Sequence, residues 1–155
     1  MSGLINDVRS RSGILGIHSA NRPRFLAQGS PTIHNSNYTK NYANVFWNPD
    51  GSYVNSTGVF TCKTAGLYYF GTAQYKQSGT ISEGDWSGMQ FQVAGGGSAI
   101  DLAGFSPAHN TGQTSSTGTT FYPMKVDETM RAWTSFAVQA STPRNYFFGV
   151  WISAL

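Results

Sequence analysis

The side chains that most often carry out catalysis are few and scattered in this chain. Its 155 residues include one cysteine, Cys62, and three histidines, His18, His34 and His109. No two histidines have the spacing that places two metal ligands on one helix or hairpin, and no Gly-x-Ser-x-Gly sequence marks a serine nucleophile. Cys62 lies in a strand-like alternation, which is typical of a buried structural thiol. These residues indicate a protein that is not an enzyme.

Two acidic pairs are the remaining candidates for acid–base chemistry or metal binding. Glu83 lies two residues before Asp85, and Asp127 is followed directly by Glu128. Neighbouring carboxylates in β turns are usually solvated, whereas a glycosidase needs two opposed carboxyl groups at a defined separation. Asp85 or Asp101 would supply too few oxygen ligands for calcium. We therefore expect no catalytic residue, no metal and no cofactor.

The composition favours an oligomer with an aromatic core. Apolar residues make up 39% of the chain and aromatic residues 14%, but charged residues only 11%, against about a quarter in typical soluble chains. A surface with so few charges is poorly protected against association. We expect one folded domain whose surface is partly covered by other copies of the chain.

The whole formal charge of +3 lies in the first two dozen residues. Four arginines stand there against one aspartate, namely Arg9, Arg11, Arg22, Arg24 and Asp7. Clustered aromatic residues do not accompany these arginines, which makes nucleic acid a poor candidate partner. We interpret residues 1–22 as an arm that reaches an acidic protein surface, ahead of a head domain at 23–155. No apolar run has the length of a signal peptide or membrane-spanning helix, so we expect no membrane association.

Strand and turn signals fill the chain from Phe25 onward. Strands are predicted at 25–27, 59–63, 67–75, 89–93, 122–126, 130–138 and 146–152, from alternating or aromatic-rich runs. Asn48-Pro49-Asp50-Gly51 predicts a turn, as does the segment 94–98, and the Asn-, Thr-, Ser- and Gly-rich segment 107–120 predicts a long exposed loop. This pattern is typical of an all-β protein built from antiparallel sheets.

The last predicted strand, 146–152, is apolar at every position except Gly149. A strand that loses its alternation is covered on both faces. One face would pack in the core, and a neighbouring subunit would cover the other. The alternative is an edge strand that the arm of the same chain covers.

The spacing of glycine and aromatic residues between Phe46 and Phe70 resembles the globular head shared by the complement q subunits and the tumour necrosis factor superfamily. The residues that carry the resemblance are Phe25-Leu26-Ala27, Asn48 and Tyr53, Gly58-x-Phe60-x-Cys62, Gly66-x-Tyr68-x-Phe70 and Phe147-Phe148-Gly149. The segment from Val126 to Met130 departs at the glycine of the family's Gly-Asp-x-Val sequence. The resemblance implies a ten-stranded, two-sheet jelly roll that assembles as a trimer and serves binding or scaffolding.

The opening of the chain, residues 4–16, resembles that of small virion proteins of marine and cyanobacterial tailed phages. Together the two resemblances imply a trimeric capsid decoration, or cement, protein on the outer capsid surface, assembled in the bacterial host cytoplasm. Its partners would be two further copies of the chain and the major capsid protein. The expected capsid-binding residues of the arm are Leu4, Ile5, Val8, Arg9, Arg11, Ile14, Leu15, Arg22 and Arg24. The expected core or trimer-interface residues are Phe25, Tyr68, Phe70, Phe147, Phe148, Val150, Trp151 and Ile152.

The alternative interpretation is a receptor-binding tip or adhesin of a tail fibre that recognises a host surface glycan. Its candidate contact residues are Tyr38, Tyr42 and Trp86, because aromatic side chains in long polar loops suit carbohydrate contact. A secreted lectin-like or signalling head is a third interpretation. The absence of a signal sequence and of a collagen-like tract counts against it.

Overall fold

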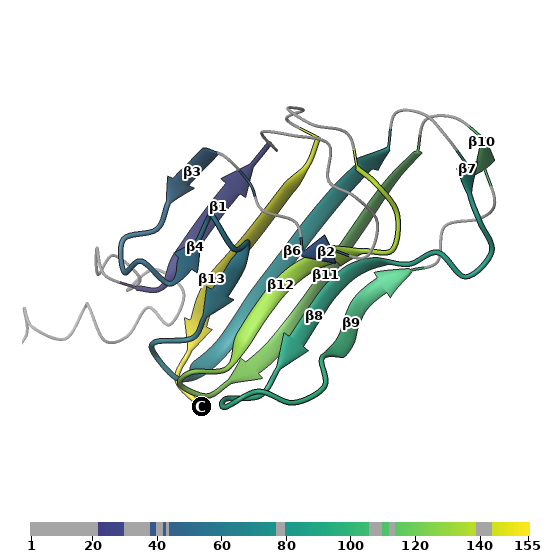
Figure 1. The fold of residues 1–155 in the computed structure, drawn as a ribbon. Coiled ribbons are helices and arrows are strands. Elements are labelled where there is room, and N and C mark those ends of the chain that lie inside the picture. Colours follow the sequence, from purple (N-terminus) through teal and green to yellow (C-terminus); the bar gives the residue numbers. More distant parts are fainter. Residues whose placement is uncertain are drawn as a thin grey trace, which may run out of the picture.

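The computed structural model describes residues 22–29, 38–39, 42, 44–76, 80–105, 110–111, 114–138 and 144–155. Most of the predicted arm, including Leu4, Ile5, Val8, Arg9, Arg11, Ile14 and Leu15, lies outside these residues. Every regular element in the described ranges is a strand (Figure 1), and these ranges include no helix that could cross a membrane.

Two antiparallel sheets form a sandwich (Figure 1). The five-stranded sheet has the order β11 (Thr114–Met124), β6 (Gly66–Lys76), β13 (Tyr146–Ser153), β1 (Arg24–Gln28) and β3 (Asn44–Trp47). The six-stranded sheet has the order β4 (Tyr53–Val54), β5 (Val59–Thr61), β12 (Thr129–Thr134), β8 (Ser87–Gln92) and β9 (Ile100–Phe105), and β2 (Tyr38–Thr39) also pairs with β12. A small separate ladder joins β7 (Thr80–Ile81) to β10 (Asn110–Thr111). The predicted all-β, two-sheet architecture is confirmed.

Aromatic side chains fill the space between the sheets. Phe60 on β5 is fully buried, and its ring centroid lies 5.4 Å from those of both Tyr68 and Phe70 on β6 of the other sheet. Phe25 on β1 stacks on Tyr53 at 4.8 Å. Because side chains alternate between the two faces of a strand, Phe60, Tyr68 and Phe70 all point toward the opposite sheet. The Gly-x-Phe and Gly-x-Tyr-x-Phe spacings thus place their aromatic residues in the core.

The turn between β11 and β12 explains the departure from the expected glycine. Asp127 has φ 68°, in the left-handed region that favours glycine. Its N–H donates to the carbonyl oxygen of Cys62 at 2.8 Å, and the Cys62 N–H donates to that of Glu128 at 2.8 Å. Asp127 therefore holds the backbone position at which the resemblance implies glycine, and Glu128 takes the place of the following aspartate.

The predicted loop over 107–120 is wrong for the described residues 110–111 and 114–120. Residues 110–111 form β10, and β11 begins at Thr114 and pairs with β6 along its whole length, from Thr114 opposite Lys76 to Met124 opposite Gly66. The strand looks like a loop in the sequence because it lies at the edge of the sheet and its outward side chains are polar. Threonine nevertheless favours the extended backbone, and this preference outweighs the polar composition.

Candidate functional site

The outer face of the five-stranded sheet carries apolar side chains that the described part of the chain leaves partly uncovered. On β13, Phe147 and Gly149 point into the core, whereas Tyr146, Phe148 and Val150 alternate with them and are half-buried on the other side. The apolar run at the end of the sequence thus supplies both faces of one strand, with alternate residues on each face. The opposite sheet covers only one of these faces.

Neighbouring strands extend this outer face in register. Leu26 on β1 lies opposite Phe148, and Val150 lies opposite Tyr69 on β6, which in turn lies opposite Phe121 on β11. The ring centroid of Tyr69 lies 4.8 Å from that of Phe121 and 5.6 Å from that of Phe148. Such cross-strand aromatic contacts stabilise a sheet and hold its side chains in fixed positions.

Gly71 lets the Phe148 ring lie flat on the sheet. A Cβ atom at Gly71 would come within 2.4 Å of Cε1 of Phe148. The residue opposite Phe148 on β6 therefore has to be glycine for the ring to take this position.

The exposed ends of this face lie at the two edges of the sheet. The side chain of Phe121 on β11 is 62% exposed, and that of Trp47 on β3 is 57% exposed. We call the outer-face side chains the apolar face, which comprises Leu26, Trp47, Tyr69, Phe121, Tyr146, Phe148 and Val150. Large apolar surfaces of this kind mark interaction sites.

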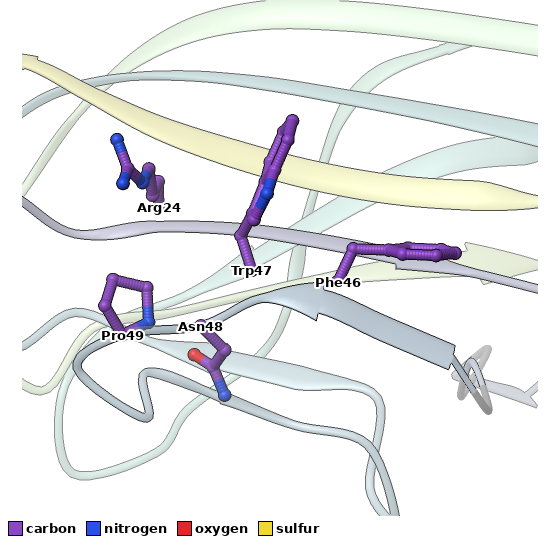
Figure 2. A pocket seen from close by; sticks show the side chains of 5 residues that line it. All are labelled: Arg24, Phe46, Trp47, Asn48 and Pro49. Carbon is purple, nitrogen blue, oxygen red and sulfur yellow. The ribbon is translucent and has the colours of Figure 1, made fainter.

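An open pocket of about 310 Å³ lies at the β3 edge and is lined by Arg24, Phe46, Trp47, Asn48 and Pro49. Figure 2 shows the Arg24 guanidinium and the Trp47 indole on the same side of the strands, with the Phe46 ring extending away from them. The Asn48 amide is engaged elsewhere, because its Nδ2 donates to the Tyr53 carbonyl oxygen at 2.8 Å and its Oδ1 accepts from the Tyr53 N–H at 3.1 Å. The pocket therefore offers aromatic surface and one cation.

Arg22 and Arg24 are the two predicted capsid-binding residues that the structure describes. The Arg22 guanidinium lies over the Trp151 ring, 4.6 Å from its centroid, which is a cation–π contact. The N–H of Trp151 donates to the carbonyl oxygen of Pro23 at 2.9 Å. The chain thus enters the head along β13, at the edge of the core.

The other expected interface residues divide between the core and the surface. Phe25, Tyr68, Phe70 and Phe147 are fully buried core residues within this chain. Phe148 and Val150 lie on the apolar face, Trp151 packs against the edge of the core, and Ile152 is 38% exposed where the β13 pairing shifts register. The sequence interpretation missed Trp47, Tyr69 and Phe121. Tyr69 could have been found, because it lies between Tyr68 and Phe70 and strand alternation places it on the opposite face from these two core residues.

The candidate glycan contacts do not form one site. Tyr42 is 1% exposed and its hydroxyl accepts a hydrogen bond from Nε2 of Gln74 at 2.6 Å, so its assignment as a ligand contact is wrong. Tyr38 lies in β2, and its side chain is outside the described part of the structure. Trp86 is half-buried beside Trp133, with ring centroids 5.6 Å apart.

Three buried tyrosines and Cys62 are held in their neutral forms. Burial raises the pKa of Tyr42, Tyr53 and Tyr68, and it raises the pKa of the Cys62 thiol despite hydrogen bonds to Tyr68 and Thr64 that lower it. A neutral thiol is a poor nucleophile. Among the described residues, no three histidine, cysteine, aspartate or glutamate side chains gather into a group that could hold a metal.

These pKa shifts predict a chain that loses stability in alkali. The unfolded chain ionises its tyrosines near pH 10 and its cysteine about 1.5 units lower, while the folded chain keeps these groups protonated, so the free energy of unfolding falls as pH rises through this range. We expect the buried tyrosines to titrate only together with loss of the circular dichroism signal, as followed by ultraviolet absorbance. Complete tyrosine ionisation near pH 10 in a chain with intact circular dichroism would contradict this expectation.

Comparisons with known proteins agree with this architecture. Residues 25–93 match the C1q domain family. The globular domain of zebrafish complement 1qA superposes with a TM-score of 0.59 at 14% identity, covering 86% of this chain and 100% of that one. The chain has the jelly-roll fold of C1q and tumour necrosis factor heads. The Eiger tumour necrosis factor of S. frugiperda superposes with a TM-score of 0.67 at 9% identity, covering 86% of this chain and 94% of that one. No curated protein sequence matches significantly.

The C1q match includes the glycine and aromatic spacings at Gly58–Cys62 and Gly66–Phe70 on which the resemblance rested. Domains with the C1q or tumour necrosis factor fold are generally not enzymes, and they typically form homotrimers that mediate binding. The apolar face is therefore the candidate functional site of this chain.

Proposed function

We propose that the chain is a binding head that forms a homotrimer through its apolar face. The observation that carries the proposal is the run of neighbouring side chains Leu26, Phe148, Tyr69 and Phe121, which is apolar across four strands and only half-buried or exposed among the described residues. Burying this row against another copy would remove large aromatic surfaces from water, and aromatic residues dominate the energy of such interfaces.

The two edges of the apolar face favour a closed ring over a two-fold dimer. The β11 edge presents Phe121 beside Tyr69, whereas the β3 edge presents Trp47 and the pocket beside Arg24. A ring needs two different surfaces that complement one another, and a two-fold dimer needs one surface that complements itself. In the proposed trimer, the Phe121 edge of each subunit packs against the face and pocket of the next.

In the full proposal this trimer decorates the outer surface of a phage capsid. The supports are the excess of positive charge in the arm and the resemblance of residues 4–16 to phage virion proteins. Arg22 fixes the root of the arm on Trp151, so three arms leave the trimer at equivalent places. Three arms that engage the major capsid protein together gain avidity over one.

Removal of the arm tests this role. A variant that lacks residues 2–21 is expected to remain trimeric but to lose at least about a hundredfold in apparent affinity for capsids, because multivalent arms contribute about 10²–10⁴ through avidity. Cosedimentation with capsids measures the loss. The matched controls are Arg9→Glu with Arg11→Glu, which should mimic the deletion, and Arg9→Lys with Arg11→Lys, which should retain most binding. A truncated chain that coats capsids normally would overturn the anchoring role.

A tail-fibre tip that recognises a surface glycan is the second candidate function. The observation that favours it is the pair of half-buried indoles, Trp86 and Trp133, on the six-stranded sheet. Copy number in the particle separates the two candidates, because a decoration protein is abundant on the shell and a fibre tip is scarce.

A further inference from the structure

The six-stranded sheet carries two indoles on the face turned away from the core. Trp133 alternates with the buried residues Ala132 and Thr134 of β12, so its side chain points outward. Trp133 lies opposite Gly88 of β8. The Trp86 ring rests on Gly88 and Gly104, since a Cβ atom at Gly104 would come within 2.2 Å of Cζ2 of that ring. One side of the Trp86 ring is thus closed by backbone, and the half-buried indole can be approached only from the other.

Ser135 holds Trp86 in this position. The Ser135 N–H donates to the Trp86 carbonyl oxygen at 2.8 Å, and the Trp86 N–H donates to Oγ of Ser135 at 2.7 Å. The same hydroxyl donates to Oδ1 of Asp85 at 2.8 Å. These bonds fix the Trp86 backbone, and the contact with Gly88 and Gly104 restricts its ring. An aromatic side chain restricted in this way loses little conformational freedom when a ligand stacks on it.

A ladder of polar side chains runs across the same face next to the indoles. Nε of Arg131 donates to Oε1 of Gln90 at 3.0 Å, and Nε2 of Gln90 donates to Oδ1 of Asp101 at 2.9 Å. Gln90 follows Gly88 by two residues, so the ladder lies about 7 Å along the strand from the row of Trp133 and Gly88. The remaining donors of Arg131 and the second carboxylate oxygen of Asp101 can bind further groups.

We propose that this surface, formed by Trp86, Trp133, Gln90, Asp101 and Arg131, binds a neutral hexose of a glycan. A hexopyranose has an apolar C–H face that suits a fixed indole, and a rim of hydroxyl groups that both donate and accept hydrogen bonds. The indole row and the polar ladder present these two kinds of partner at the separation that one sugar ring spans.

The charges of the surface favour a neutral ligand over an anionic one. Arg131 is offset by Asp101 through Gln90, and Asp85 adds a second carboxylate beside Trp86. A phosphate, sulfate or sialic acid would meet these carboxylates, and single-stranded nucleic acid needs a positively charged groove beside its stacking residues. Arg131 is the one cation among the five residues of this surface.

The glycan surface lies on the opposite sheet from the apolar face, so the proposed trimer would leave it free in all three subunits. Binding of one sugar does not depend on the trimer, although three copies of the surface would raise the avidity for a densely glycosylated target. The inference deepens the proposed binding function by naming a ligand class, and it can fail independently of the assembly.

The test is binding of the full chain to an array of neutral, sialylated and sulfated oligosaccharides, followed by titration of the methyl glycosides of galactose, glucose and mannose. We expect neutral glycans to bind, and we expect Trp133→Ala and Asp101→Ala each to weaken binding about tenfold, or by about 1.4 kcal/mol, because each removes a stacking or hydrogen-bonding partner of the sugar. Asp101 is exposed, so its variant should fold normally. Val126→Ala is the control, because it removes an exposed apolar side chain between β11 and β12, outside both the glycan surface and the apolar face, and should leave monosaccharide affinity unchanged.

Three results would overturn the inference: no binding to any neutral glycan, binding only to sialylated or sulfated glycans, or binding that both variants leave unchanged. Sedimentation of the same samples separates this failure from that of the assembly. A trimer that binds no neutral glycan contradicts only the glycan surface, whereas a monomer that binds one contradicts only the proposed trimer.

Discussion

Phe121→Asp is expected to convert the assembly to monomers at concentrations where the unaltered chain is trimeric. The Phe121 side chain is 62% exposed in the isolated chain, so the change should cost the monomer little. In the proposed ring this residue is buried against the next subunit, where an unpaired carboxylate costs about 3–5 kcal/mol. Each contact would then weaken by at least about a hundredfold, because 1.4 kcal/mol corresponds to a factor of ten.

The matched control for Phe121→Asp is Val54→Asp. Val54 is 44% exposed and lies on β4 of the other sheet. The Val54→Asp variant therefore introduces the same charge at an apolar position outside the apolar face. Analytical ultracentrifugation should show monomers for the first variant and trimers for the second. Equal assembly of both variants would show that the Phe121 edge is not an interface.

Phe60→Ala is expected to lower the free energy of unfolding by about 3–5 kcal/mol, the usual cost of removing a buried phenyl ring. The Phe60 ring is fully buried and contacts Phe25, Tyr68 and Phe70 from the opposite sheet. Its loss would leave a cavity between the sheets that the rigid strands cannot close. Since a domain is stable by only about 5–15 kcal/mol, this variant should be close to unfolding at physiological temperature.

Val59→Ala provides the comparison for Phe60→Ala. Val59 precedes Phe60 on β5, and its half-buried side chain points to the other face, so its truncation should cost about 1 kcal/mol or less. Urea denaturation measures both. Similar losses for the two variants would contradict the inward orientation of Phe60 and with it the register of β5.

The core could be predicted from the sequence because its signals are local. In Gly58-x-Phe60-x-Cys62 and Gly66-x-Tyr68-x-Phe70, the alternation alone indicates which side chains share a face, and the structure buries all four aromatic and sulfur-bearing residues. The sequence signal for the turn at Asn48–Gly51 was equally local, and the structure has Gly51 there at φ 64°.

The apolar face was harder to predict because both faces of its strands are apolar. The run from Tyr146 to Ile152 indicated two covered faces, but it did not show that Phe148 would lie over Gly71 or that Phe121 would meet Tyr69. These contacts depend on the pairing of β13 with β6 and of β6 with β11, and the paired strands are far apart in the chain. Register of this kind is a property of the assembled sheet.

The glycan surface combines a predicted residue with unpredicted partners. Trp86 was a candidate contact in the sequence, whereas Trp133 and the ladder of Arg131, Gln90 and Asp101 become neighbours only when β12, β8 and β9 pair. Tyr42 was misassigned because a tyrosine in an Asn-rich segment resembles a loop residue, and its place in the core depends on contacts with Tyr53 and Gln74, which are distant in sequence.

The mass of the intact protein in solution tests the central claim most directly. Native mass spectrometry or sedimentation equilibrium at micromolar concentration should give three times the chain mass of 16.8 kDa, with the species reduced to one chain by Phe121→Asp. A monomer at that concentration, or a dimer that Phe121→Asp leaves intact, would contradict a trimer assembled through the apolar face.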